Sequence, residues 1–266
     1  MLIKQIRAVV LGCLAVLSAA SLTATAAYGE AGPFWHHRAN SKEGLGSKIE
    51  EKAPETVTGT GGEKILFGSI AETTVTITSK SLQVKSILYN NALQGQLKLT
   101  VKLNEVRLVK PELKGCEVKV GENNEYKAEG HLMWKWNGEK GQLSELPVKE
   151  QTHDMVLTST PIEAGATELP KASLTTISLK GSGCGVLVGT FKVGGSIAAV
   201  TTPAGLEEWS PQLTVKTPGP TKQHFWNGKE TIGAEPRLEF DNVLAHVEGT
   251  AEGKTTSGQE IAVFEK

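Results

Sequence analysis

The chain has 266 residues, of which 39% are hydrophobic and 21% charged, and its net charge is −1. This length can bury a real core in one large domain or two small ones, and the weak net charge produces no strong field. Beyond residue 26 only three arginines occur and the lysines are scattered, which argues against nucleic-acid binding. Asp154 and Asp241 are the only aspartates, so a calcium loop of the EF-hand type is excluded.

Residues 1–26 have the three parts of a secretory signal peptide. Two basic residues precede an apolar run over 8–20, and small residues follow at 24–27. The run is shorter than the ~20 residues that a membrane-spanning helix requires. We therefore predict cleavage after Ala26, with the bond after Ala27 as the alternative. The mature protein is then secreted or associated with the cell envelope, and it has no membrane span.

Residues 27–61 are rich in Gly, Glu, Lys, Ser and Thr and show almost no apolar periodicity. This composition predicts a mobile N-terminal arm. The exception is the aromatic and basic cluster from Gly32 to Arg38, which includes Phe34, Trp35, His36 and His37. A cluster of this kind can dock onto the folded part of the chain, although its sequence does not indicate a role.

Beyond residue 61 the apolar residues recur with a period of two, as a strand with one buried face requires. Residues 97–103 alternate apolar with polar side chains, and the alternation slips near Asn104 and Glu105 because Val106 and Leu108 continue the apolar face. A β-bulge at this point would absorb the slip.

The same alternation predicts a second long strand over 126–136, followed by a turn at Asn137 and Gly138. Shorter strands are predicted at 73–78, 82–89, 153–160, 173–180, 186–193, 196–201, 212–216, 237–247 and 259–264. Since no segment has helical spacing, residues 62–266 are predicted to form a single antiparallel all-β domain. Its architecture is a sandwich, a jelly roll or an open barrel of about a dozen short strands. A boundary between two domains would fall at 217–220.

The predicted core takes the inward-facing residues of these strands. They are Leu97, Leu99, Val101, Leu103, Leu132, Trp134, Trp136, Leu213, Val215, Leu238 and Phe240.

Two cysteines, Cys116 and Cys184, remain after removal of the signal peptide, and both follow a glycine in a turn-like context. An exported protein meets an oxidising environment, so the pair predicts a disulfide bond. Two unpaired thiols are the alternative.

The chain resembles a group of β-rich proteins exported by soil actinobacteria. The resemblance is carried by the cluster from Gly32 to Arg38 and by the C-terminal stretches 236–240, 248–250 and 262–264. It implies export and β structure. No activity is established for that group, so the resemblance carries over no functional residues.

Catalytic and metal-binding patterns are weak. The adjacent His36 and His37 point in different directions and have no third ligand at a suitable spacing, so we expect no metal. The Ser-Gly cluster over 181–185 is not a nucleophile elbow and is interpreted as a turn that carries the disulfide. Glu207 and Glu208 are the nearest approach to a glycosidase pair, but glutamates in a lysine-rich chain are mostly surface residues.

Ligand binding requires less than catalysis. Trp35, Trp209 and Trp226 have polar or proline-rich neighbours, which makes them candidates for exposed stacking against a sugar. An interior lined by Leu and Val would suit a lipid in an open barrel, although a filled core gives the same pattern. We therefore expect a non-catalytic exported β domain without a cofactor, with a structural or binding role at the cell envelope or in the medium. The alternatives are a carbohydrate-binding or glycoside-hydrolysing module, with an envelope glycan as partner, and a lipid-binding barrel.

Overall fold

The computed structural model describes residues 32–38, 46–136, 153–163, 166, 168–202, 208–218, 224–226, 231–232 and 236–264. Within these ranges the chain is almost entirely antiparallel β-sheet, with a short 3-10 helix, η3 (Ser182–Leu187). The predicted all-β class is confirmed. No helix in the described part of the chain has the length and apolar character that a membrane crossing needs.

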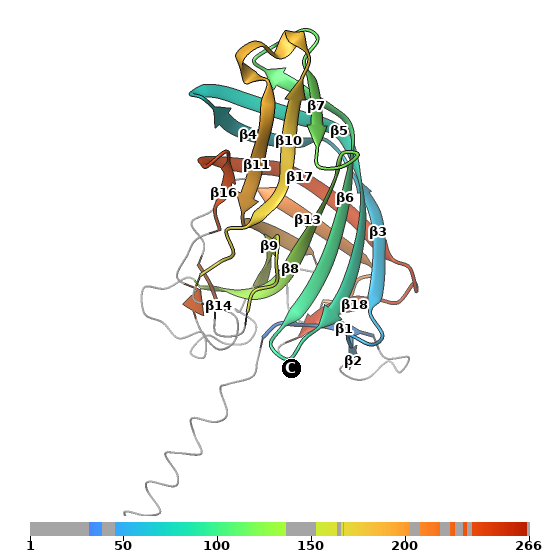
Figure 1. The fold of residues 1–266 in the computed structure, drawn as a ribbon. Coiled ribbons are helices and arrows are strands. Elements are labelled where there is room, and N and C mark those ends of the chain that lie inside the picture. Colours follow the sequence, from blue (N-terminus) through green and yellow to red (C-terminus); the bar gives the residue numbers. More distant parts are fainter. Residues whose placement is uncertain are drawn as a thin grey trace, which may run out of the picture.

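A closed ring of antiparallel strands forms the body of the fold (Figure 1). The eight strands are β3 (Glu55–Gly61), β5 (Thr73–Asn90), β6 (Gly95–Lys110), β8 (Glu125–Trp136), β9 (His153–Thr158), β12 (Ile197–Thr202), β13 (Gln212–Pro218) and β17 (Val243–Thr255). They pair in the order β13-β12-β9-β8-β6-β5-β3-β17, and β17 pairs back with β13. Each ring strand therefore has two neighbours, and the barrel is closed. An open barrel was one of the predicted architectures.

A second curved sheet covers one end of the barrel. The strand β4 (Lys64–Ile70) continues the direction of β3 and keeps the same neighbours, β5 and β17. From the first residues of β17 the sheet continues through β16 (Leu238–Phe240), β11 (Gly189–Gly195) and β10 (Ser173–Lys180) to β7 (Glu117–Val120). Residues of β7, β10, β11 and β16 line the same internal space as residues of β4, β5 and β6, so the two groups of strands face each other.

At one level of the barrel, the residues that point inward change between odd-numbered and even-numbered positions. This change occurs in β6, in β5 and between β3 and β4. On β6 the backbone of Glu105 has a φ of 50°, and Leu103 and Val106 both line the interior although they are three residues apart. A regular strand would put these two side chains on opposite faces, so the slip predicted near Asn104 and Glu105 is confirmed. On β5 the inward residues likewise change from Ser79 to Leu82.

The same change across β3 and β4 decides the position of a lysine. Val57 of β3 lines the interior, and uninterrupted alternation would turn every odd-numbered residue inward. Two residues, 62 and 63, lie between the strands, and the next inward residues are Lys64 and Leu66. The break in alternation therefore turns Lys64 into the barrel rather than toward solvent.

The predicted mobile arm is wrong for the part of residues 27–61 that the structure describes. β1 (Phe34–His37) pairs with β2 (Ser47–Lys48) and with β18 (Ile261–Phe264) in a small sheet, and residues 55–61 form a strand of the barrel. Trp35 is fully buried in this small sheet. Its partner strand lies at the other end of the chain, so local periodicity could not reveal the pairing. The expected docking of the cluster from Gly32 to Arg38 is confirmed.

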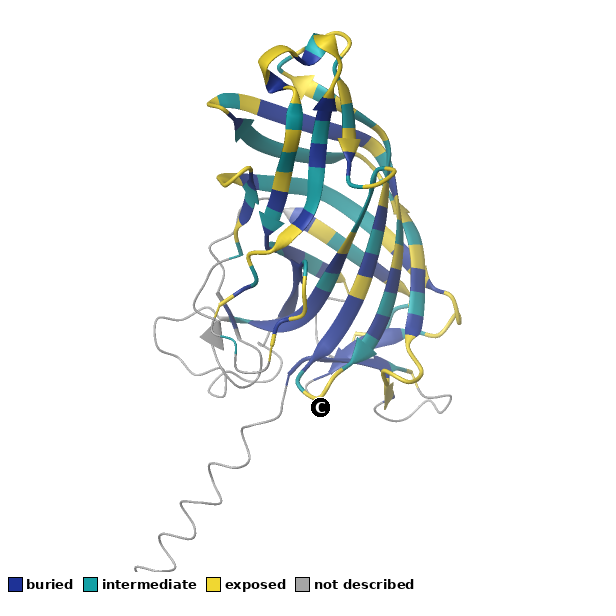
Figure 2. Cartoon of the chain, in the orientation of Figure 1, coloured by how far each residue is buried: buried dark blue, intermediate teal, exposed yellow. Residues whose placement is uncertain are grey.

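Most predicted core residues are buried, and dark blue positions alternate with lighter ones along the barrel strands in Figure 2. The exceptions are Leu103 and Val215, which are half-buried because they face internal cavities, and Trp136, whose side chain lies outside the described residues. The Cys116–Cys184 disulfide is present and joins the segment before β7 to η3.

Candidate functional site

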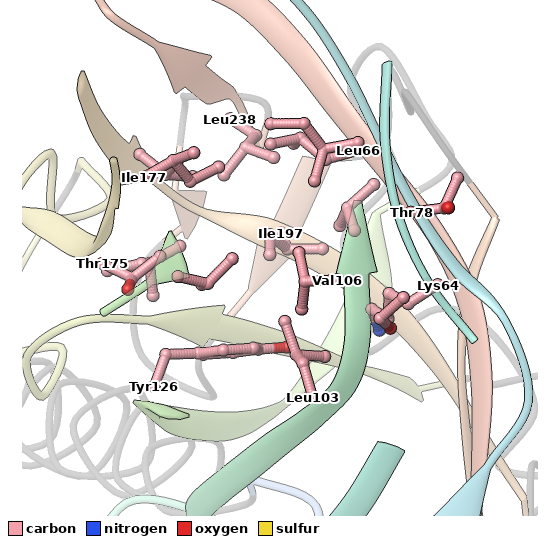
Figure 3. A pocket seen from close by; sticks show the side chains of 16 residues that line it. Lys64, Leu66, Thr78, Leu103, Val106, Tyr126, Thr175, Ile177, Ile197 and Leu238 are labelled. Atoms are coloured by element: carbon pink, nitrogen blue, oxygen red, sulfur yellow. The ribbon is translucent and has the colours of Figure 1, made fainter. Parts of the chain in front are cut away.

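An apolar cavity of about 70 Å³ lies between the second sheet and β4, β5 and β6, and it is partly open to solvent (Figure 3). Its lining is mainly aliphatic and includes Leu66, Leu103, Val106, Ile177, Val193 and Leu238. Several of these side chains are only half-buried because they face the cavity rather than one another. The cavity exists because two curved sheets meet at this level without their side chains filling the space between them.

A second cavity of about 30 Å³ lies inside the ring of strands. Every one of the eight ring strands contributes to its lining, so it is the lumen of the barrel. The two cavities share three lining residues, namely Lys64, Tyr126 and Ile197. These three residues therefore mark the junction between the lumen and the larger cavity.

Lys64 reaches the junction from β4. The stem of its side chain runs over Gly249 of β17, where a Cβ atom would lie only 2.9 Å from Lys64 Cδ. Desolvation by burial lowers the pKa of Lys64 to about 8. At neutral pH the amine is still mostly protonated, and no described carboxylate forms an ion pair with it. An unpaired cation in an apolar surrounding is costly, and Lys64 is the one basic residue among those that line the two cavities.

Ser79 of β5 lies directly across from Lys64 in the strand register. Cross-strand neighbours of this kind have Cβ atoms about 5 Å apart and point to the same face. The Ser79 side chain is 2% exposed, and its hydroxyl has no hydrogen-bond partner among the described residues. A buried hydroxyl without a partner costs about 1–3 kcal/mol, so Ser79 has an unused donor and acceptor that lines the same cavity as Lys64.

Tyr126 extends from β8 into the cavity (Figure 3). Burial raises the pKa of Tyr126 to about 12, so the phenol keeps its proton at physiological pH. The junction thus presents an ammonium group, a hydroxyl and a phenol to an otherwise aliphatic space. This arrangement can hold a hydrogen-bond acceptor, and an anionic one best of all.

The tryptophans predicted to stack on a ligand do not form a platform. Trp35 is fully buried, so the prediction of an exposed ring is wrong for this residue. Trp209 is half-buried and packs against Phe264, with 5.3 Å between the ring centroids. The side chain of Trp226 lies outside the described residues. Trp35 and Trp209 therefore belong to the packing of the small sheet and its surroundings. The polar residues next to them in sequence did not reveal these packing partners.

The weak catalytic candidates are not assembled into a site. Glu207 lies outside the described residues, while Glu208 is exposed. His37 Nε2 lies 3.1 Å from Glu55 Oε2, and the Ser257 hydroxyl donates to the same oxygen at 2.7 Å. The carboxylate sits between the serine and the histidine, so the histidine cannot take a proton from the serine as a nucleophile would require.

Other candidate chemistry is likewise accounted for by structure. Ser182 lies in η3 beside Cys184, whose sulfur is in the disulfide and unable to act as a nucleophile. Within the described residues no group of three His, Cys, Asp or Glu side chains is placed to hold a metal ion.

Sequence reasoning missed Lys64, Ser79 and Tyr126. Lys64 immediately precedes the apolar run from Ile65 to Phe67, and Ser79 follows a run of Thr, Val and Ile. Both look like ordinary strand residues unless the parity change at residues 62–63 is known. The one available signal was the slip at Asn104 and Glu105, because a bulge in one strand of a sheet alters the facing of its neighbours.

Comparison of the chain with protein family models, with curated proteins and with solved structures finds no match in any of the three. The site therefore has to be interpreted from its own geometry.

Proposed function

We propose that this chain is a non-catalytic exported protein that binds a small amphipathic, lipid-like molecule inside its barrel. The observation that carries the proposal is the partly open apolar cavity, which shares the lining residues Lys64, Tyr126 and Ile197 with the barrel lumen. Ligand sites in proteins combine apolar walls with a few polar groups that fix orientation, and this cavity has that composition. The buried Trp35 and half-buried Trp209 give the carbohydrate alternative no comparable support.

The size of the cavity limits the ligand. An apolar cavity of about 150 Å³ accepts a benzene molecule. The cavity here, of about 70 Å³, takes a narrower group, such as the end of an alkyl chain, and a longer molecule must extend through the open side or into the lumen. Medium-chain compounds such as 1-octanol are therefore the appropriate first probes.

We expect 1-octanol to bind at the cavity and to lose at least about tenfold in affinity when Val106→Phe fills it, because the added ring occupies the space of the ligand. Methyl NMR spectra during the titration test this, with shifts expected for Leu103 and Leu238 and not for the exposed Leu244. Val109→Phe is the matched control, since Val109 is an exposed residue of the same strand. Equal binding of 1-octanol by both variants would contradict the proposal.

Export is supported by the signal-peptide pattern of residues 1–26 and by the disulfide, a bond that persists in oxidising compartments. We expect an exporting host to release a protein that begins at Ala27 and has no free thiol. Intact-mass and N-terminal analysis of the medium measures both. A protein that stays in the cytoplasm with residues 1–26 attached would contradict export without bearing on ligand binding.

A further inference from the structure

The interior of the barrel contains a cation whose counter-ion is missing from the described chain. Of the residues that line the two cavities, only Lys64 and Tyr126 have titratable side chains, and neither has a carboxylate. The acidic residues adjacent in sequence to Lys64 and to Gly249, namely Glu63 and Glu248, do not line either cavity. Glu63 is exposed, and the Glu248 carboxylate lies 3.7 Å from His246 Nε2. The positive charge of Lys64 is therefore balanced by no described side chain facing the cavity.

A second group beside Lys64 is also unsatisfied. The Ser79 hydroxyl is buried without a partner, and it comes from the strand position paired with Lys64. Folded proteins rarely leave such groups unpaired, and a bound ligand or water molecule is one of the explanations for an exception. An unpaired amine and an unpaired hydroxyl on adjacent strands, both facing one apolar space, form a matched pair of donors.

We propose that the Lys64 amine and the Ser79 hydroxyl bind a carboxylate, so that the ligand of the barrel is a small aliphatic carboxylic acid. The carboxylate site requires the ligand-binding function proposed above and adds the chemical class of the ligand. One carboxylate oxygen accepts from the ammonium group and the other from the hydroxyl, with the Tyr126 phenol as a further donor at the junction. The alkyl part packs against Leu66, Leu103 and Val106.

A carboxylate fits this site better than the other common lipid head groups. Its single negative charge balances the single cation, and it offers two oxygens to two neighbouring donors. A phosphate would bring a second charge that no other basic residue of the lining balances. A neutral alcohol would leave the ammonium group unpaired in the cavity. The site therefore favours the monoanion.

Comparison of octanoate with 1-octanol tests the charge directly, since the two probes share an alkyl chain. A charge-assisted hydrogen bond contributes about 1.5–3 kcal/mol, so we expect octanoate to bind about tenfold or more tightly than 1-octanol near pH 7. The preference should shrink above about pH 8 as Lys64 loses its proton, whereas the carboxylate and Tyr126 do not titrate between pH 6 and 9. Isothermal titration calorimetry at several pH values measures both effects.

Variants assign the effect to the two residues. Lys64→Met keeps an unbranched apolar stem and should abolish the preference for octanoate without loss of 1-octanol binding. Ser79→Ala should weaken octanoate binding severalfold, which supplies an independent test that does not depend on the folding of the Lys64 variant. Lys85→Met is the matched control, because Lys85 is an exposed residue of β5 and its loss should leave both affinities unchanged.

The outcomes separate this site from the proposed function. Binding of 1-octanol with equal affinity for octanoate, or a preference that survives Lys64→Met, would overturn the carboxylate site and leave the binding function standing. Tighter binding of octyl phosphate than of octanoate would overturn the assignment to carboxylic acids. Failure of all three probes to bind would instead refute the proposed function.

Discussion

Loss of the Cys116–Cys184 disulfide is expected to lower the free energy of unfolding by about 4 kcal/mol. The two cysteines are 68 residues apart in sequence, and a crosslink that closes a loop of this length removes about 4 kcal/mol of chain entropy from the unfolded state. Domains are stable by only about 5–15 kcal/mol, so this is a large part of the total. Guanidinium denaturation of the wild type and of C116A/C184A measures the difference.

The fold explains where the loss is felt first. Among the described strands, β7 pairs only with β10, and the disulfide is the covalent tie between the segment before β7 and η3. Amide exchange should therefore accelerate at Gly121, whose N–H donates to the Thr176 carbonyl, before it does in the barrel strands. Reduction of the wild-type disulfide with a phosphine is the control, because it breaks the crosslink without removing the two sulfur atoms that C116A/C184A also loses. A loss below about 1 kcal/mol in both experiments would contradict the entropic account.

The sequence predicts those parts of the fold that depend on the alternation of apolar and polar residues within a single strand. Residues 97–103 alternate so regularly that the strand, its buried face and the slip beyond Leu103 all follow from period two. The predicted strands 73–78 and 82–89 are in fact one strand, β5, of 18 residues. The interruption between them is a change of parity at Lys80 and Ser81 rather than a turn.

Pairings between distant segments could not be predicted in this way. β1 consists of aromatic and basic residues that look exposed, yet its pairing with β18 places Trp35 where it is fully buried in the main core. The sequence of β1 contains no trace of that partner. The same limit applies to barrel closure, because the pairing of β13 with β17 depends on the curvature of the whole sheet and not on either strand alone.

The candidate site could not be predicted from the sequence for a related reason. A lysine in a strand is normally assigned to the solvent face, and Lys64 is one of many lysines in this chain. Its inward orientation depends on the coincidence of three parity changes in β3 to β6, of which only the one in β6 has a clear sequence pattern. The donors Lys64 and Ser79 become neighbours only through the register of β4 and β5.

Replacement of Lys64 by methionine is expected to stabilise the ligand-free protein by about 3 kcal/mol at pH 7. The pKa of Lys64 falls from 10.5 in a solvated chain to about 8 in the fold, and each pKa unit corresponds to about 1.4 kcal/mol. Between pH 8 and 10.5 the unfolded chain binds more protons than the native one, so the wild type gains stability as the pH rises through this window. At and below pH 8 it therefore retains the cost of a half-buried, unpaired ammonium group, which methionine removes.

The advantage of Lys64→Met should accordingly be largest at pH 7 and should fade toward pH 10.5, and denaturation curves of both proteins across this range measure it. Lys85→Met, at an exposed position, should show no such trend. Saturating octanoate should close the gap at pH 7 by stabilising only the wild type, because a ligand that binds the native state adds its binding free energy to stability. A Lys64→Met variant that is no more stable than the wild type at pH 7 would mean that the amine already has a partner. The carboxylate proposed above would offset this cost by supplying the missing negative charge.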